Sequence, residues 1–149
     1  MGEQIHLTVA TVVERDGKYL CVAEYENGKR VYNQPAGHVE PGEEITAAAL
    51  RETLEETGWH VDLTGFMGIT TYTAPSNGVT YYRVCFAAKV QRFDPDYELD
   101  SDIEEALWLS YEELLQREPE LRSPLVLQAI EDHRSSHIYP MSLLKALQQ

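Results

Sequence analysis

The chain has 149 residues, and its 25 acidic residues outnumber 12 basic ones, which gives a formal net charge of −13 at neutral pH. This length predicts a single domain over 1–149. Such a domain buries roughly 70% of the surface that its unfolded chain exposes, and it needs no stabilising cross-link to fold. Hydrophobic residues at 43% and charged residues at 25% exclude a long disordered or collagen-like chain. The excess of acidic residues argues against a nucleic-acid partner, because the chain repels a polyanion and contains no run of Lys or Arg to attract one.

The cysteines and the N-terminus indicate the compartment. Cys21 and Cys85 stand in β-like apolar stretches, which favours two buried reduced thiols over a disulfide. The N-terminus lacks the basic and apolar regions of a secretory signal. No apolar run approaches the roughly 20 residues that span a bilayer. We therefore expect a soluble cytoplasmic protein without membrane contacts.

The elements follow from apolar patterning and turn signals. β-branched and apolar stretches predict strands. They cover 7–13, 19–25, 31–34, 66–73, 79–90 and 106–109. A helix is predicted over 44–57, where Gly58 stands at a natural position to end it. Later helical segments are expected at 111–117, 124–134 and 141–147. Loops are expected at 37–42, rich in glycine and proline, and at 93–102, rich in acids. This order predicts an α/β protein with one mixed sheet and helices packed on it.

The predicted helix over 44–57 carries an unusual acidic end. At about 100° per residue, Glu52 and Glu56 continue the apolar stripe of its first turns, and Glu55 stands to one side. The helix dipole disfavours anions there, the three carboxylates repel one another, and Arg51 is the only basic residue on the helix. A solvated acidic surface is one interpretation. The other is a Mg²⁺ or Mn²⁺ site, since both ions prefer oxygen ligands.

A longer pattern surrounds these glutamates. Gly37 is followed after five residues by Glu43, and after seven more by the run Arg51-Glu52-Thr53-Leu54-Glu55-Glu56-Thr57-Gly58-Trp59. This 23-residue pattern resembles the Nudix box of the Nudix hydrolase family, with its fixed polar and glycine positions at the right spacing. Thr53 and Trp59 replace aliphatic residues at packing positions, so these departures bear on local fit rather than on chemistry.

The resemblance implies the Nudix fold, an α/β/α sandwich around a mixed sheet. It also implies Mg²⁺- or Mn²⁺-assisted hydrolysis of a diphosphate linked to another moiety. The residues that match the metal-binding glutamates of the family are Glu52, Glu55 and Glu56. The backbone carbonyl of Gly37 matches a position that often completes the metal shell. Glu43 and Arg51 match a structural pair that holds the loop against the helix.

Three further segments narrow the resemblance. Residues 33–38, 101–103 and 121–126 are similar to a bacterial subgroup of Nudix phosphatases. The resemblance implies activity on hydroxymethylpyrimidine pyrophosphate and thiamine pyrophosphate, and also on nucleoside di- and triphosphates. The alternatives are hydrolysis of another nucleoside diphosphate-linked substrate, and a Nudix-like module that binds nucleotides without turnover. The partner is a small molecule in each case, and the chain is expected to be a monomer or a homodimer.

The general base has two main candidates. Glu55 is the candidate within the box. Family members also recruit an acid from a later loop, which makes Asp102 the next candidate, since it lies in a segment similar to the subgroup. Glu104 and Glu105 stand nearby, but solvated surface positions are the better interpretation for them.

Substrate contacts are expected from polar and aromatic residues outside the box. Arg83 interrupts an apolar strand, which indicates either a phosphate contact or a salt bridge on the sheet. Arg30 and Arg122 are further candidates for phosphate binding. His38 directly follows Gly37 and is expected either to line the site or to cap the loop, and Gln34, three residues before Gly37, is expected to contact the substrate. Three tyrosines could stack on a pyrimidine ring or could belong to the core: Tyr32, Tyr72 and Tyr81.

Overall fold

The computed structural model describes residues 4–147. The strands are β1 (Ile5–Arg15), β2 (Lys18–Glu26), β3 (Lys29–Asn33), β4 (Ala36–His38), β5 (Trp59–Thr73), β6 (Thr80–Phe93) and β7 (Ile103–Ser110). The α-helices are α1 (Ile45–Thr57), α2 (Tyr111–Gln116) and α3 (Pro124–Arg134). Two short 3₁₀ turns are η1 (Glu118–Glu120) and η2 (Met141–Leu143).

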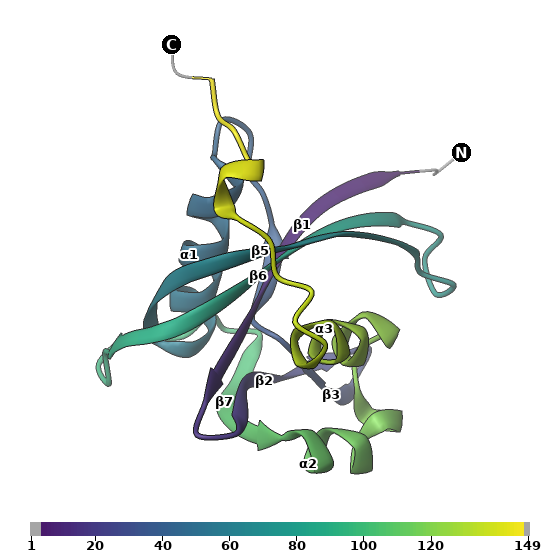
Figure 1. The fold of residues 1–149 in the computed structure, drawn as a ribbon. Coiled ribbons are helices and arrows are strands. Elements are labelled where there is room, and N and C mark those ends of the chain that lie inside the picture. The colour runs from purple at the N-terminus through teal and green to yellow at the C-terminus, as the bar shows by residue number, and fades with distance from the viewer. Residues whose placement is uncertain (1–3, 148–149) are drawn as a thin grey trace.

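The strands form one mixed sheet around β1 (Figure 1). Strand β1 pairs in parallel with β6 and antiparallel with β4, while β5 pairs antiparallel with the far side of β6. The turn after β1 leads into β2, which lies between β3 and β7. The main path runs β3-β2-β1-β6-β5. This arrangement confirms the mixed sheet that the order of elements predicts.

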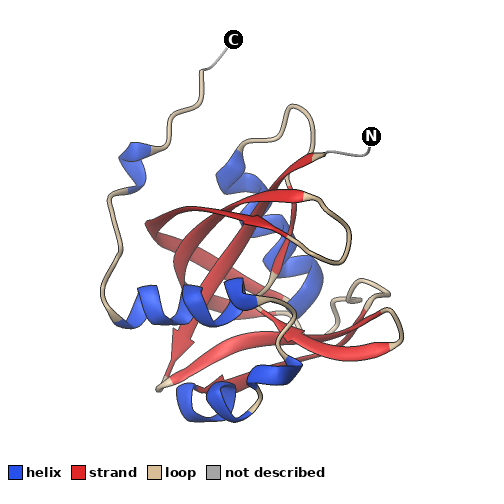
Figure 2. Cartoon of the chain, turned by 90° about the vertical axis from the view of Figure 1, so that its right-hand side faces the viewer, coloured by secondary structure: helices blue, strands red, loops and turns tan. Residues whose placement is uncertain are grey.

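Helices cover both faces of the sheet (Figure 2). On one face, Ala48 and Ala49 of α1 pack against Val84 and Phe86 of β6. On the other face, α2 and α3 close a larger core. The result is the α/β/α sandwich that the sequence resemblance implies.

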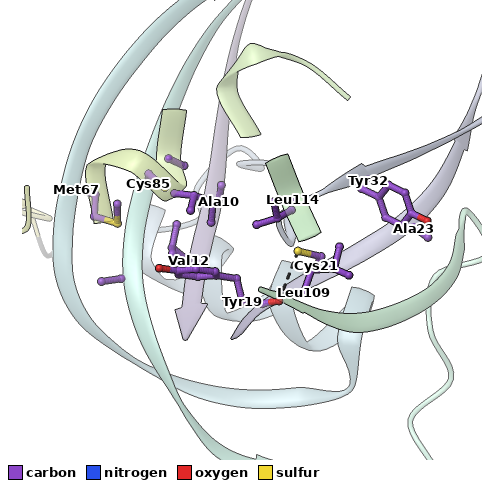
Figure 3. Close-up of a cluster of buried hydrophobic side chains, with 13 residues drawn as sticks. Ala10, Val12, Tyr19, Cys21, Ala23, Tyr32, Met67, Cys85, Leu109 and Leu114 are labelled. Carbon is purple, nitrogen blue, oxygen red and sulfur yellow. Dashed lines mark hydrogen bonds between the residues drawn. The ribbon is translucent and has the colours of Figure 1, made fainter. Parts of the chain in front are cut away.

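The core under α2 and α3 is shown in Figure 3. Tyr19 and Cys21 of β2 and Cys85 of β6 lie among small and aliphatic side chains. Both cysteines are buried free thiols, as expected, and the Cys21 Sγ donates a hydrogen bond to the Tyr19 carbonyl at 3.5 Å. Across residues 4–147, no helix combines the length and the apolar character needed to cross a membrane.

Three elements differ from the sequence-based expectation. Residues 36–38 form β4, although the loop was expected to begin at residue 37, because the Gly37 segment pairs with β1 opposite Val9. Strand β5 begins at residue 59 rather than 66, and register shifts near 60, 63 and 66 hide its alternation. The segment 141–147, expected as one or two helical turns, forms the single 3₁₀ turn η2.

Candidate active site

Helix α1 places the acidic residues of the box at its C-terminal end, beside β4. The buried residues Ala48 and Ala49 fix one face of the helix against the sheet. Gly58 ends it in the left-handed conformation, at φ 76°, and its N–H donates to the Leu54 carbonyl at 2.9 Å. Glu52, Glu55 and Glu56 are therefore held in the last two turns by packing and by a local backbone bond.

The two unusual box residues fit their surroundings. Thr53 is fully buried, and its hydroxyl lies 2.8 Å from the Thr11 hydroxyl on β1, so its polar atom is satisfied. Trp59 packs against Phe93 and Trp108, with ring centroids 5.0 and 5.9 Å away. A polar contact and an aromatic cluster replace the aliphatic packing, and the acidic end of α1 keeps its place.

Three carboxylates converge at this end of the helix. One oxygen each of Glu52, Glu55 and Asp100 lies within 4.8 Å of the others. Asp100 comes from the loop after β6, and its backbone N–H donates to the Glu55 carbonyl at 3.0 Å. The sequence indicated an acidic loop at 93–102 but did not single out Asp100, because a backbone contact between distant segments brings it here.

The other acids considered as bases lie elsewhere. Asp102 is exposed and stands outside the group formed by Glu52, Glu55 and Asp100. Glu104 and Glu105 form ion pairs with Arg30 at 2.7 and 2.9 Å. Arg30 is therefore paired with carboxylates at the protein surface.

Glu56 points into the protein from the same helix. It is 9% exposed, and one oxygen accepts a hydrogen bond from the Ala36 backbone N–H at 3.0 Å. Burial, reinforced by the nearby Glu24 and Glu52 carboxylates, raises the pKa of Glu56 to about 9. Burial also raises the pKa of Glu52. A bound cation would favour the ionised form of both groups.

Gly37 lets the backbone of β4 lie against the Glu52 carboxylate, as a metal site that uses both groups would need. A Cβ at Gly37 would lie 2.1 Å from Cδ of Glu52 and 2.3 and 2.4 Å from its two oxygens. Only glycine therefore allows the β4 backbone to lie directly on this carboxylate. Carboxylate and carbonyl oxygens with no sulfur or imidazole ligand form a donor set suited to Mg²⁺ or Mn²⁺. The residues present fit such an ion.

Arg51 links several residues of the box through hydrogen bonds. Its Nε and Nη2 atoms donate to the two carboxylate oxygens of Glu43 at 2.7 and 2.9 Å. Its Nη1 donates to Glu52 and Glu55, both at 2.9 Å, and Nη2 also reaches the His38 carbonyl at 3.1 Å. One guanidinium thus offsets the charge of the acidic cluster and ties the preceding loop to α1.

The Glu43–Arg51 contact predicts a pH-dependent stability. The Arg51 guanidinium, helped by the Glu40 backbone N–H, lowers the pKa of Glu43 from 4.5 to about 2. A carboxyl with a lowered folded-state pKa stabilises the fold above its unfolded pKa, and this stability is lost as pH falls through the folded value. Glu43→Gln should therefore lower the melting temperature at neutral pH, and the difference from the parent should shrink between pH ~5 and pH ~2.

Thermal unfolding followed by circular dichroism over this pH range checks the prediction. Glu40→Gln, at an exposed neighbouring carboxyl, is the matched control and should follow the parent. A Glu43→Gln difference that stays constant down to pH ~2 would show that the ion pair does not carry it.

The residues expected to contact substrate separate into two groups. His38 is exposed beside Gly37, and its Nε2 lies 3.0 Å from Nδ1 of His6. Gln34 is 1% exposed, and its amide bonds to Arg83 at 2.9 Å and to the Val126 carbonyl at 2.7 Å. His38 thus lies where a ligand can reach it, whereas Gln34 is occupied inside the protein.

A cavity of about 480 Å³ lies between β5 and the start of α3. Tyr72, Arg122 and Ser123 are among its lining residues. Arg122 also pairs with Glu24 and Glu26 at 2.8 and 2.6 Å. Among the other tyrosines considered, Tyr81 is half-buried opposite Tyr72 on the sheet, whereas Tyr32 is buried in the core.

Comparison with known proteins places this geometry in a family. The profile of the NUDIX domain matches residues 4–128. Phosphatase NudJ of Escherichia coli K12 is 41% identical over 139 residues, which cover 93% of this chain and 90% of the relative. Phosphatase NudJ of Shigella flexneri matches to the same extent.

Solved structures agree with the sequence relatives. A NUDIX hydrolase from Nitrosomonas europaea superposes with a TM-score of 0.94 at 44% identity, covering 97% of this chain and 98% of the other. A MutT protein from Methanosarcina mazei, with a TM-score of 0.69 at 19% identity, covers 91% and 98% and shares the fold. The matched domain, the curated relatives and the arrangement of the box residues lead to one conclusion: the chain belongs to the Nudix hydrolase family.

Proposed function

We propose that the protein is a Mg²⁺- or Mn²⁺-dependent phosphatase or pyrophosphohydrolase that acts on small-molecule diphosphates. The observation that carries this proposal is the convergence of Glu52, Glu55 and Asp100 within 4.8 Å, directly beside the backbone of Gly37. A protein with a net charge of −13 needs local positive charge to hold a diphosphate, and a divalent cation in this cluster would supply it.

The favoured substrates are hydroxymethylpyrimidine pyrophosphate and thiamine pyrophosphate, followed by nucleoside di- and triphosphates. This choice is supported by the resemblance of three segments to the bacterial subgroup and by the 41% identity to proteins named phosphatase NudJ. The cavity near Tyr72 and Arg122 is large enough for a pyrimidine-sized ring, and its tyrosine offers a stacking surface.

Glu52, Glu55 and Asp100 would hold the metal, together with the Gly37 carbonyl and with Glu56 on the inner side. When bound, such an ion neutralises phosphate oxygens and lowers the pKa of a coordinated water. Arg51 orients Glu52 and Glu55 through its Nη1 hydrogen bonds. Glu55, whose side chain is 31% exposed, would accept a proton from the attacking water at a carboxylate oxygen.

The two aspartates of the later loop should differ in effect. Asp100→Asn removes a charge from the acidic cluster and should lower kcat by about 10²-fold or more, as expected for the loss of a metal ligand or a base. Asp102→Asn changes an exposed carboxylate outside the cluster and should stay close to the parent. Steady-state kinetics with Mg²⁺ on the same substrate compares them. The opposite ranking would return the role of the loop acid to Asp102.

Phosphate release from a panel of diphosphates tests the proposed function. The panel contains hydroxymethylpyrimidine pyrophosphate, thiamine pyrophosphate and nucleoside di- and triphosphates, each assayed with Mg²⁺ and with EDTA. We expect release that EDTA abolishes, with the highest kcat/KM on a pyrimidine-containing pyrophosphate. If no compound releases phosphate, the enzyme proposal is wrong and a nucleotide-binding module takes its place.

A further inference from the structure

A buried arginine on β6 has no role in the acidic cluster. Arg83 is 5% exposed, and within residues 4–147 its guanidinium donates hydrogen bonds to neutral acceptors only. Nη2 donates to Asn33 Oδ1 at 3.0 Å and to Gln34 Oε1 at 2.9 Å, while Nη1 donates to the Leu125 carbonyl at 3.3 Å. These bonds use three of the five N–H donors of the guanidinium.

The charge of Arg83 is uncompensated by the part of the chain that the structure describes. No carboxylate oxygen of residues 4–147 lies within 4.0 Å of its nitrogens, so the alternative of a sheet-face salt bridge is wrong. The ionisable groups that interact with its guanidinium are the buried thiol of Cys85 and a second cation, Arg122. A buried guanidinium without a counter-ion is unfavourable, so it indicates an anion that arrives from outside.

The register of the sheet connects Arg83 to His38, which is exposed beside Gly37. On the sheet, Arg83 pairs with Thr8 of β1 and Thr70 of β5, and Thr8 pairs in turn with His38 of β4. Paired positions on neighbouring strands point to the same face. Arg83 and His38 thus share the face toward α3, whereas the neighbouring Gly37 faces Glu52 on the side of α1.

Asn33 gives a second connection. Its Oδ1 accepts from Arg83, and its Nδ2 lies 3.5 Å from Oε1 of Glu24. Glu24 also binds Arg122, which lines the cavity beside α3. Arg83 is thus joined through Asn33 and Glu24 to a residue that lines this cavity, and the Glu24 charge also acts on Glu56 at the inner side of the acidic helix end.

We infer that Arg83 is a cationic subsite that binds a phosphate group of the substrate through an N–H donor that its protein partners leave free. This inference rests on the proposed function. A cation held by the acidic cluster would supply one positive charge for a diphosphate, and Arg83 would supply a second that belongs to the protein itself. The amides of Asn33 and Gln34 orient the guanidinium without cancelling its charge.

A structural tie is the competing explanation for the same contacts. Arg83 joins the segment before β4 to the first turn of α3, which neutral donors could also do. The two explanations differ in one respect: a tie depends on the hydrogen bonds and a subsite depends on the charge. The experiment must therefore separate the loss of the charge from the loss of these hydrogen bonds.

Calorimetric binding of methylenediphosphonate to the full chain, in the presence of Mg²⁺, provides the readout. Arg83→Gln should weaken binding by about 10- to 100-fold, the range expected for a charged hydrogen bond. Arg83→Lys, which keeps the charge, should bind more tightly than Arg83→Gln. Arg92→Gln changes an exposed arginine on the same strand and should bind like the parent.

A second set leaves Arg83 itself unchanged, which covers the case in which its variants do not fold. Thr70→Asp places a carboxylate beside Arg83 and should weaken binding by a similar factor, whereas Thr70→Asn should not. Thr71→Asp adds the same charge on the opposite face of β5, where the side chain is exposed, and should have a much smaller effect.

The outcomes separate the explanations. Parent-like binding by Arg83→Gln or by Thr70→Asp overturns the subsite, and equal losses in Arg83→Gln and Arg83→Lys indicate a structural tie instead. The measurement needs no turnover. If binding depends on Arg83 while no substrate is hydrolysed, the proposed function fails and the subsite stands. If hydrolysis proceeds and binding does not depend on Arg83, the proposed function stands and the subsite is wrong.

Discussion

Glu56→Gln is expected to fold normally and to lose nearly all metal-dependent hydrolysis. The amide has nearly the shape of the carboxyl group, and its oxygen can still accept the Ala36 N–H bond inside the protein. It cannot become an anion, so it cannot favour a cation beside Glu52. We expect kcat with Mg²⁺ to fall on the order of 10³-fold, which corresponds to about 4 kcal/mol of transition-state stabilisation.

The matched control is Glu44→Gln, which makes the same charge change at the exposed residue before α1, where the side chain forms no capping bond. It should keep parental kcat. Melting temperatures of both variants should remain close to the parent. Near-normal turnover of Glu56→Gln on any substrate from the panel would remove Glu56 from the catalytic machinery.

Gly37→Ala is the second change with a large expected effect. The new Cβ would lie 2.1 Å from Cδ of Glu52, and the flexible end of that side chain is the part that can move. The fold should therefore survive, while the Glu52 carboxylate leaves its place beside Glu55 and Asp100. A displacement of about 1 Å in a catalytic group can cost about 10²-fold in rate, and we expect a loss of at least this size in kcat/KM.

A shorter acid at position 52 checks the cause of this loss. Glu52→Asp withdraws the carboxylate by one methylene, which relieves the clash with a Cβ at position 37. The double variant Gly37→Ala/Glu52→Asp should therefore lose less than the product of the two single losses. Additive losses, or full activity of Gly37→Ala alone, would show that the close packing of Gly37 on Glu52 has no part in the reaction.

The central helix was predictable from sequence because its signals are local. Apolar spacing, the glycine after Thr57 and the repulsion among three glutamates all lie within one short segment. The strands around it were less predictable. In β5, the polar residues His60 and Asp62 and the later register shifts break the two-residue alternation, so the first half of this strand resembles a loop in sequence.

The site shows the same division between local and distant information. The box glutamates follow from spacing, whereas Asp100 joins them through a backbone bond to Glu55 that spacing does not reveal. In sequence, Arg30 follows Lys29 and Arg83 interrupts an apolar strand, and both are candidates for phosphate binding. The fold gives Arg30 two carboxylate partners 74 and 75 residues away, and it gives Arg83 only neutral acceptors. The charge of their hydrogen-bond acceptors, rather than the residue type, distinguishes the two arginines.

Titration of the 149-residue chain with Mn²⁺, followed by electron paramagnetic resonance, tests the account most directly. The parent should bind Mn²⁺, and Mg²⁺ should compete for the same site. Glu52→Gln should lose most of this affinity, while Glu44→Gln should retain it. If the parent binds no Mn²⁺ even with methylenediphosphonate present, or if Glu52→Gln binds as tightly as the parent, the crowded carboxylates at the end of α1 are not a metal site.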